Sequence, residues 1–185
     1  MLKRRSRTPR FKRRRTGSRF ASWWVLWRVH VLLLIVMAAW WFGVRPVMEE
    51  QGWVRVTQDF ALCGERSSEA AGCVVDGDTL IIGFGNDRRR IRLTGFDAPE
   101  LDGACQAERE AAQKARGALH DWIGEGPIEW NGADDPPYDQ YGRELRAARR
   151  VARDGSREFL AETMIKRGLA AESGWGAEPK NWCSE

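Results

Sequence analysis

The sequence predicts an α+β fold that is mainly β: a small closed barrel of five short strands with two helices packed on it, preceded by one transmembrane helix. Three observations lead to this prediction. Residues 20–44 are almost wholly apolar, short apolar segments separated by turn residues fill residues 72–93, and helical periodicity marks 105–123 and 156–167. No internal repeat is present, so a single domain is expected after the apolar segment.

Charge is distributed unevenly along the chain. Residues 1–20 hold ten basic residues and no acidic ones, whereas residues 49–185 hold 18 basic and all 26 acidic residues, a net charge of −8. The overall charge of +4 therefore comes from the tail, and the domain is not expected to bind nucleic acid through bulk charge. The expected division is a basic cytoplasmic tail (1–20), a transmembrane helix (21–45), a linker (46–70) and a globular domain (71–185).

The apolar segment has the length of a membrane span. From Trp23 to Trp41 a helix would measure about 27 Å, close to the roughly 30 Å of a bilayer's hydrocarbon layer. Tryptophans gather at both ends, as in interfacial belts, and the basic tail favours a cytoplasmic N-terminus, with the domain in the periplasm or outside the cell. The alternatives are a signal peptide cleaved near Ala38, which would release a secreted domain, and the buried helix of a soluble protein.

All four cysteines follow the apolar segment, and no two have C-x-x-C spacing. An even number in a part expected outside the cytoplasm predicts disulfides and disfavours a zinc site. Of the three possible pairings, we favour the one that joins Cys63 to Cys73 across a short loop. The same pairing joins Cys105 to Cys183, which would tie the chain's end to the first domain helix. Free buried thiols are the alternative.

Five short strands are expected in the domain, at 73–75, 79–83, 89–93, 128–130 and 145–151. Turn residues separate the first three, and residues 89–93 alternate polar and apolar side chains, as a half-buried strand does. Residues 53–56, in the linker, also have strand character. The first domain helix should end at Gly124, while Ser156 should cap the second and Gly168 should end it.

Two acidic residues are candidates for a cation site. Asp78 and Asp97 lie at the two ends of the hairpin that the second and third strands form, so strand pairing could bring them together. Two carboxylates, a backbone carbonyl and water are a typical ligand set for calcium or magnesium. The alternative is that Asp76 and Asp78 are turn residues on either side of Gly77.

Three further residues could handle a phosphate and a water molecule. Arg92 lies on the third strand, and Glu100 follows it on a loop. Arg143 follows Gly142, whose conformational freedom can turn the guanidinium inward. Two guanidiniums flanking a phosphate would stabilise the charge that develops during hydrolysis. The alternative is a set of solvated surface charges, as the neighbouring basic run 88–90 would suggest.

The motifs that matter occur in this order: Asp76-Gly77-Asp78-Thr79, Arg92-x4-Asp97-Ala98-Pro99-Glu100, Asp139-x-Tyr141-Gly142-Arg143 and Arg167-Gly168-Leu169-Ala170. In order and spacing this set resembles the staphylococcal nuclease (thermonuclease) family, over roughly residues 72–171. Each motif alone is weak, but together they are specific.

The resemblance implies an OB-fold barrel that hydrolyses phosphodiester bonds of DNA and RNA with calcium. By matching positions, the calcium ligands would be Asp78, Asp97 and the backbone carbonyl of Ala98. Glu100 would orient and deprotonate the attacking water. Arg92 and Arg143 would hold the phosphate and stabilise the five-coordinate transition state. A domain outside the cytoplasm would meet enough calcium to fill a weak site.

The chain departs from the family pattern in its substrate contacts. The family's nucleotide-stacking tyrosines after the second helix have no counterpart, which leaves Tyr141 and Trp175 as candidates for substrate binding. The sequence thus predicts a membrane-anchored, calcium-dependent, monomeric nuclease acting on DNA or RNA. The alternatives are a non-catalytic OB-fold module of the cell envelope that binds nucleic acid or protein, and an envelope protein whose function lies in its anchor and disulfides.

Overall fold

The computed structural model describes residues 19–64 and 71–184. The basic tail expected at 1–20 lies almost entirely outside the described residues, as does the polar part of the linker at 65–70. The chain divides into two compact units, with the boundary between Met48 and Glu49. The apolar helix belongs mainly to the first unit, and all described strands belong to the second.

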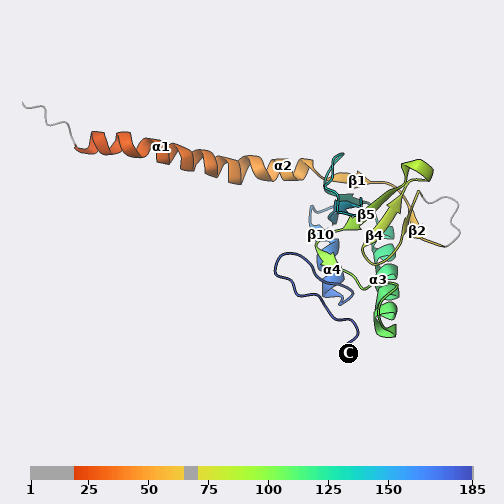
Figure 1. Ribbon diagram of the computed structural model, residues 1–185. Coiled ribbons are helices and arrows are strands. Elements are labelled where there is room, and N and C mark those ends of the chain that lie inside the picture. Colours follow the sequence, from red (N-terminus) through yellow and green to blue (C-terminus); the bar gives the residue numbers. More distant parts are fainter. Residues whose placement is uncertain (1–18, 65–70, 185) are drawn as a thin grey trace, which may run out of the picture. The chain divides into compact units, whose positions relative to one another are not determined.

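The apolar segment is helical, as predicted. α1 (Arg19–Ala39) continues through a π-helical turn, η1 (Trp40–Val44), into α2 (Arg45–Gln51) (Figure 1). From Trp27 to Gln51 this helix is long and apolar enough to span a membrane, a property that a signal sequence shares. Its large apolar side chains are exposed, Val36 for example to 64%. An apolar environment therefore suits them better than water does.

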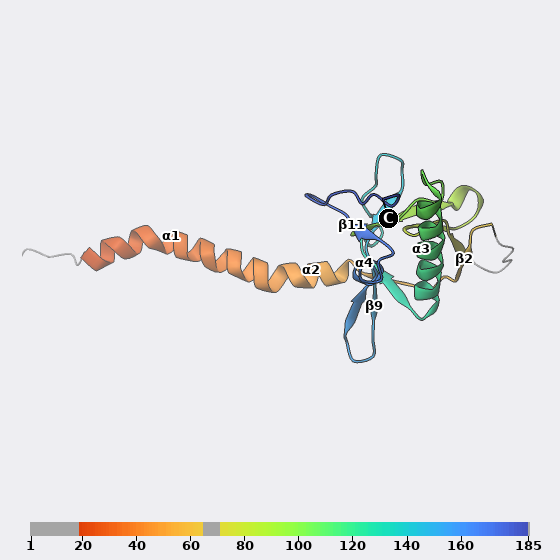
Figure 2. The ribbon, with the colours of Figure 1, turned by 90° about the horizontal axis from the view of Figure 1, so that it is seen from below.

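Three sheets are present among the described residues of the domain (Figures 1 and 2). The five-stranded sheet has the order β2 (Phe60–Leu62), β3 (Gly72–Val74), β4 (Thr79–Ile82), β5 (Arg89–Leu93) and β8 (Glu144–Arg146). The four-stranded sheet has the order β1 (Val54–Val56), β7 (Ile128–Trp130), β9 (Ala148–Val151) and β10 (Arg157–Phe159). The two-stranded sheet pairs β6 (Phe96–Asp97) with β11 (Ala171–Glu172). The β2–β3 and β5–β8 pairs are parallel, and the others are antiparallel.

The α+β class is confirmed, but no closed barrel is seen among the described residues. The strand expected at 145–151 is interrupted at Ala147, where the chain leaves the five-stranded sheet as β8 and enters the four-stranded sheet as β9. The backbone N–H of Ala147 donates to the side chain of Asn131, at 2.7 Å. The chain changes sheets at this residue: β8 is an edge strand of the five-stranded sheet, whereas β9 lies between β7 and β10 in the four-stranded sheet.

Of the two domain helices, one lies where expected and the other starts late. α3 (Gln106–Gly124) ends at the predicted glycine. α4 (Leu160–Lys166) begins later than expected because residues 157–159 form β10 against β9. Ser156 does not cap this helix. It belongs to the turn before β10, where its backbone N–H and its hydroxyl both donate to Asp154.

The core lies between the strands and α3, with α4 next to α3 (Figure 1). The buried face of α3 is the predicted one, made of Ala112, Ala115, Leu119, Trp122 and Ile123. Leu80 of β4 and Ile91 and Leu93 of β5 belong to the same buried cluster. The β4–β5 hairpin is therefore fixed on the core by one face, while the 3₁₀ turn η2 (Gly85–Asp87) joins its exposed end.

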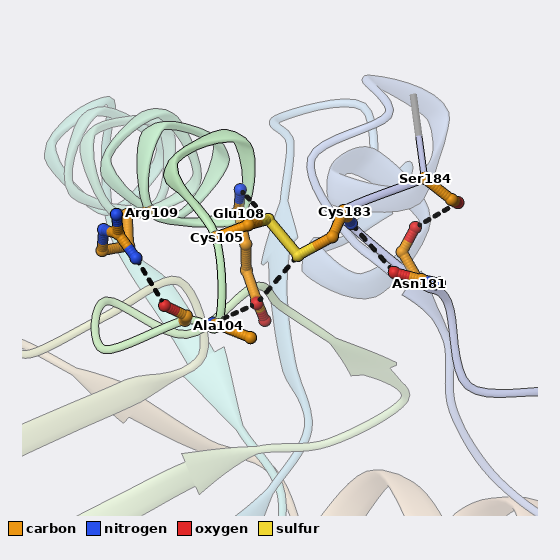
Figure 3. Close-up of a disulfide and its surroundings, with 8 residues drawn as sticks. Ala104, Cys105, Glu108, Arg109, Asn181, Cys183 and Ser184 are labelled. Carbon is orange, nitrogen blue, oxygen red and sulfur yellow. Dashed lines mark hydrogen bonds between the residues drawn. A yellow bond between two sulfur atoms is a disulfide. The ribbon is translucent and has the colours of Figure 1, made fainter.

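Both predicted disulfides are present, so the free-thiol alternative is wrong. Cys63, just after β2, bonds to Cys73 of β3. Cys105, just before α3, bonds to Cys183 near the chain's end (Figure 3). Cys105 also caps α3, because its sulfur accepts from the backbone N–H of Glu108. The second disulfide thus holds the C-terminal segment against the start of α3.

Candidate active site

The β4–β5 hairpin brings the first predicted acid to the third strand. Thr79 pairs with Arg92 in the antiparallel register, and the backbone N–H of Leu93 donates to the carbonyl of Asp78 at 2.7 Å. Asp78 therefore lies beside the arginine that was expected to bind phosphate.

Arg92 is bonded to both carboxylates among the three predicted calcium ligands. Its Nη1 lies 2.8 Å from Oδ1 of Asp78, and its Nη2 lies 2.7 Å from Oδ1 of Asp97. Oε1 of Glu100 lies 4.0 Å from the same Nη1. The structure thus gathers these three predicted acids around one guanidinium, although Asp78 lies in the bend before β4, Asp97 on β6 and Glu100 in the loop after it.

Asp78 is the most deeply buried of these acids, at 1% exposure. Its carboxylate accepts from the backbone N–H of Ala98 at 3.2 Å and from the hydroxyl of Thr79 at 3.1 Å. Burial and, to a smaller extent, the charge of Asp76 raise the pKa of Asp78 to about 7, although the charge of Arg92 opposes the shift. Among the described residues, Arg92 is the one cation that pairs with Asp78, Asp97 and Glu100.

Asp76 and Gly77 form the turn that presents Asp78. The Asp76 carboxylate accepts from the backbone N–H of Asp78 at 3.1 Å, as the turn interpretation of this residue expects. A Cβ on Gly77 would lie 2.7 Å from Cβ of Ala98 and 2.8 Å from Cβ of Ala115. Only glycine fits between these two alanines, so the turn packs directly on α3 and on the residue that follows Asp97.

Glu100 follows the buried Ala98 and Pro99. Its backbone carbonyl accepts from the N–H of Gly103 at 3.0 Å, but its side chain is 61% exposed. Partial desolvation and then the charge of Asp76 raise the pKa of Glu100 above its usual value, while Arg92 lowers it. The carboxylate is thus accessible to water and more basic than an ordinary glutamate, as a general base requires.

Arg143 is held by a tight turn at residues 139–143, in the loop between β7 and β8. Asp139 accepts from the backbone N–H groups of Tyr141 and Arg143, at 2.8 and 2.9 Å, and from Nε of Arg143 at 2.6 Å. Gly142 has a φ of 74°, which lets the chain turn back within four residues. In the described part of the chain, no acceptor bonds to Nη1 or Nη2 of Arg143, so both can bind a ligand.

These residues meet at one cleft of about 850 Å³. Arg92, Glu100 and Arg143 all line it, and so does Tyr141, whose side chain is 69% exposed. Trp175 does not line the cleft: it is fully exposed, two residues after the lining residue Ser173. The structure therefore joins the predicted catalytic residues and one of the two predicted substrate contacts.

The fourth sequence motif, Arg167-Gly168-Leu169-Ala170, connects α4 to β11. Gly168, with a φ of 72°, ends the helix, and the chain then forms β11 against β6. Ala171 pairs with Asp97 in this register. The segment after this motif therefore pairs with a predicted calcium ligand, a contact that sequence reasoning missed because two-residue strands leave no periodic pattern.

The residues present fit a divalent cation. Asp78 and Asp97 both contact one guanidinium, which carries a single positive charge, and the backbone carbonyl of Ala98 follows directly in the chain. Across residues 19–64 and 71–184, three potential ligand atoms lie within 4.8 Å of one another only at Cys105, Glu108 and Cys183, where the sulfurs are bonded together. A cation at Asp78 and Asp97 would therefore also need carbonyl or water ligands.

Comparisons of this chain with protein-family models and with curated proteins give no significant match. The residues themselves are therefore the basis on which a function can be inferred. Their order and spacing carry the resemblance, and their contacts with one another provide an independent reason to consider them as one site.

Proposed function

We propose that this chain is a membrane-anchored, calcium-dependent nuclease of the staphylococcal nuclease type, which hydrolyses phosphodiester bonds of DNA or RNA. One observation carries the proposal: Arg92, Glu100 and Arg143 line a single cleft, and Arg92 contacts both Asp78 and Asp97. A base and two phosphate-binding cations around one open space are the groups that phosphodiester hydrolysis requires.

The reaction assigns a role to each side chain. A water oxygen forms a bond to phosphorus, its proton passes to the Glu100 carboxylate, and the bond from phosphorus to the leaving oxygen breaks. The leaving oxygen then takes a proton from solvent. Arg92 and Arg143 donate to the phosphate oxygens, whose negative charge grows as the five-coordinate transition state forms.

Calcium would be held by Asp78, Asp97 and the backbone carbonyl of Ala98. When bound, it would polarise a phosphate oxygen and help to position the water. Arg92 contacts both carboxylates and contributes a single positive charge to them, so a divalent cation adds the charge that the site lacks.

Two further features are part of the proposal. The domain would be an OB-fold barrel, in which the bend at Ala147 carries one strand from β8 in the first sheet to β9 in the second. The apolar helix would cross the inner membrane with its N-terminus in the cytoplasm, so that the domain lies in a calcium-containing, oxidising compartment. The two disulfides are consistent with such a compartment.

A non-catalytic module that binds nucleic acid or protein is the second candidate. It is favoured by the net charge of −8 on residues 49–185 and by the ion pairs that already engage Arg92 and Arg143. A substrate phosphate has to compete with these carboxylates. The two candidates differ in turnover, which can be measured directly.

The test uses the purified full-length chain in detergent with labelled single-stranded DNA and RNA. We expect cleavage with added calcium and none with a chelator. Glu100→Gln and Arg143→Ala should each lower kcat by about 10² or more. Glu162→Gln and Arg153→Ala, which change exposed residues outside the cleft, should keep wild-type rates. Wild-type rates in both cleft variants would refute the site, and an inactive but DNA-binding wild type would favour the second candidate.

A further inference from the structure

A third arginine, Arg90, lines the same cleft. It lies two residues before Arg92 on β5, and residues at this spacing share one face of a strand. Ile91, between the two arginines, and Leu93, after Arg92, lie on the opposite face of the strand and are buried in the core. The core-packed strand therefore presents two arginines to the cleft in succession.

Arg90 differs from Arg89 and Arg92 on the same strand, and from Arg143 across the cleft, in having no acidic partner among the described residues. Arg92 is paired with Asp78 and Asp97, Arg143 with Asp139, and Arg89 with Glu144. Within the described residues, the guanidinium of Arg90 has no hydrogen-bond or ion-pair partner, and its side chain is exposed.

An unpaired cation at this place favours an anionic ligand. The domain carries a net charge of −8, so bulk attraction cannot draw a polyanion to it. Local arginines have to supply the binding, and Arg90 is available without first breaking an ion pair. The solvated surface arginine that the basic run suggested is the competing interpretation.

We propose that Arg90 forms a second phosphate subsite, which binds the phosphate next to the one that is cleaved. This inference depends on the proposed nuclease function. Residues two apart on one face of a strand are about 6.6 Å apart, a distance comparable to the phosphate repeat of an extended single strand. The cleft would therefore select a single-stranded polynucleotide with at least two phosphates over an isolated phosphodiester.

Tyr141 suits the same class of substrate. It lines the cleft, and its ring is 69% exposed, so a base can stack on it without specific hydrogen bonds. Arg90 and Tyr141 together would hold a strand by its phosphate and by a base, without reading its sequence.

The test measures hydrolysis of oligothymidylates of two to six nucleotides by the full-length chain in detergent with calcium. For the wild type, kcat/KM should rise when a second phosphate is added. Arg90→Ala should lose about tenfold more efficiency on the hexanucleotide than on the dinucleotide, mostly through KM. The slope of log KM against log salt concentration should fall by about 0.7 for the lost phosphate contact. Arg90→Lys should recover part of the loss.

Arg88→Ala is the matched control, because it removes an exposed arginine of the same run that does not line the cleft. It should keep the wild-type dependence on length. The subsite assignment is wrong if Arg90→Ala lowers kcat/KM equally on oligonucleotides of all lengths. It is also wrong if Arg88→Ala has the same effect as Arg90→Ala.

A binding measurement separates this inference from the proposed function. Hexathymidylate binding is followed by fluorescence anisotropy with a chelator present. Weaker binding by Arg90→Ala, in a chain whose wild type cleaves nothing, would support the subsite and refute the nuclease. Equal binding by Arg90→Ala and wild type, in a chain that does cleave DNA, would refute the subsite and leave the nuclease standing.

Discussion

Nη1 of Arg92 lies 2.8 Å from Oδ1 of Asp78, a carboxylate that is almost wholly buried. The two residues meet because β4 and β5 pair in one particular register, with Thr79 opposite Arg92. The same guanidinium reaches Asp97 through its other terminal nitrogen. One predicted phosphate-binding residue and the two predicted calcium-binding carboxylates thus form one connected group.

Calcium affinity should depend on this pair of acids. Asp78→Asn and Asp97→Asn should each weaken calcium binding at least about tenfold, because each removes a charged ligand. Isothermal titration calorimetry on the full-length chain in detergent measures this without relying on activity. Asp87→Asn, which changes an exposed acid of η2, should bind calcium like the wild type. Unchanged affinity in Asp78→Asn would remove this residue from the calcium site.

The close packing of Gly77 predicts a sharp contrast between two glycines. Gly77→Ala would place a methyl group 2.7 Å from Cβ of Ala98 and should destabilise the domain by about 1–3 kcal/mol. Gly117→Ala, on α3, meets no atom within 4 Å and should be neutral or stabilise the domain by up to about 1 kcal/mol. Thermal unfolding followed by tryptophan fluorescence compares them. Equal effects would mean that the turn is not clamped on α3.

Acid should weaken the domain through Glu144. This residue is 2% exposed; burial raises its pKa, but hydrogen bonds from Arg89 and Arg146 outweigh burial and lower the pKa below its usual 4.5. Since the folded-state pKa is the lower one, the stabilisation is fully present above pH 4.5 and is lost as the pH falls through the folded-state pKa.

Glu144→Gln tests this linkage. It should lower stability by about 3 kcal/mol at neutral pH, because it leaves Arg146 buried without its ion pair. It should also flatten the fall in stability below pH 4.5. Unfolding by denaturant at a series of pH values measures both effects, with the exposed Glu162→Gln as the control. A variant that keeps the wild-type acid dependence would assign that dependence to other carboxylates.

The two disulfides should contribute unequally to stability. The sequence separations are 10 residues for Cys63–Cys73 and 78 for Cys105–Cys183. Loop-closure entropy then gives about 2.7 and about 4.5 kcal/mol respectively. Replacing both cysteines of the second pair by serine should therefore lower the melting temperature more than replacing both of the first. The reverse order would show that native contacts, and not loop length, determine their contributions.

Much of the fold could be predicted because local patterns specify it. The apolar helix, α3 with its buried face and the strand at 89–93 all follow from periodicity, and turn residues mark the hairpin. The pattern failed where tertiary pairing overrides local preference. Residues 157–159 read as the start of a helix, yet they form β10, because β9 offers them an edge with which to pair.

For the candidate site, the sequence alone determined which residue types occur and at what spacing, and this was enough to propose Asp78, Arg92, Asp97, Glu100 and Arg143. Only the tertiary structure decided how they meet. Arg92 contacts Asp78 because the β4–β5 register places them side by side, and it also contacts Asp97. Arg90 lines the cleft because Ile91 and Leu93 occupy the face of β5 that packs on the core. The exact register and the contacts across it also depend on turn geometry and on packing against residues far apart in the chain, which the spacing of residues in the sequence does not specify.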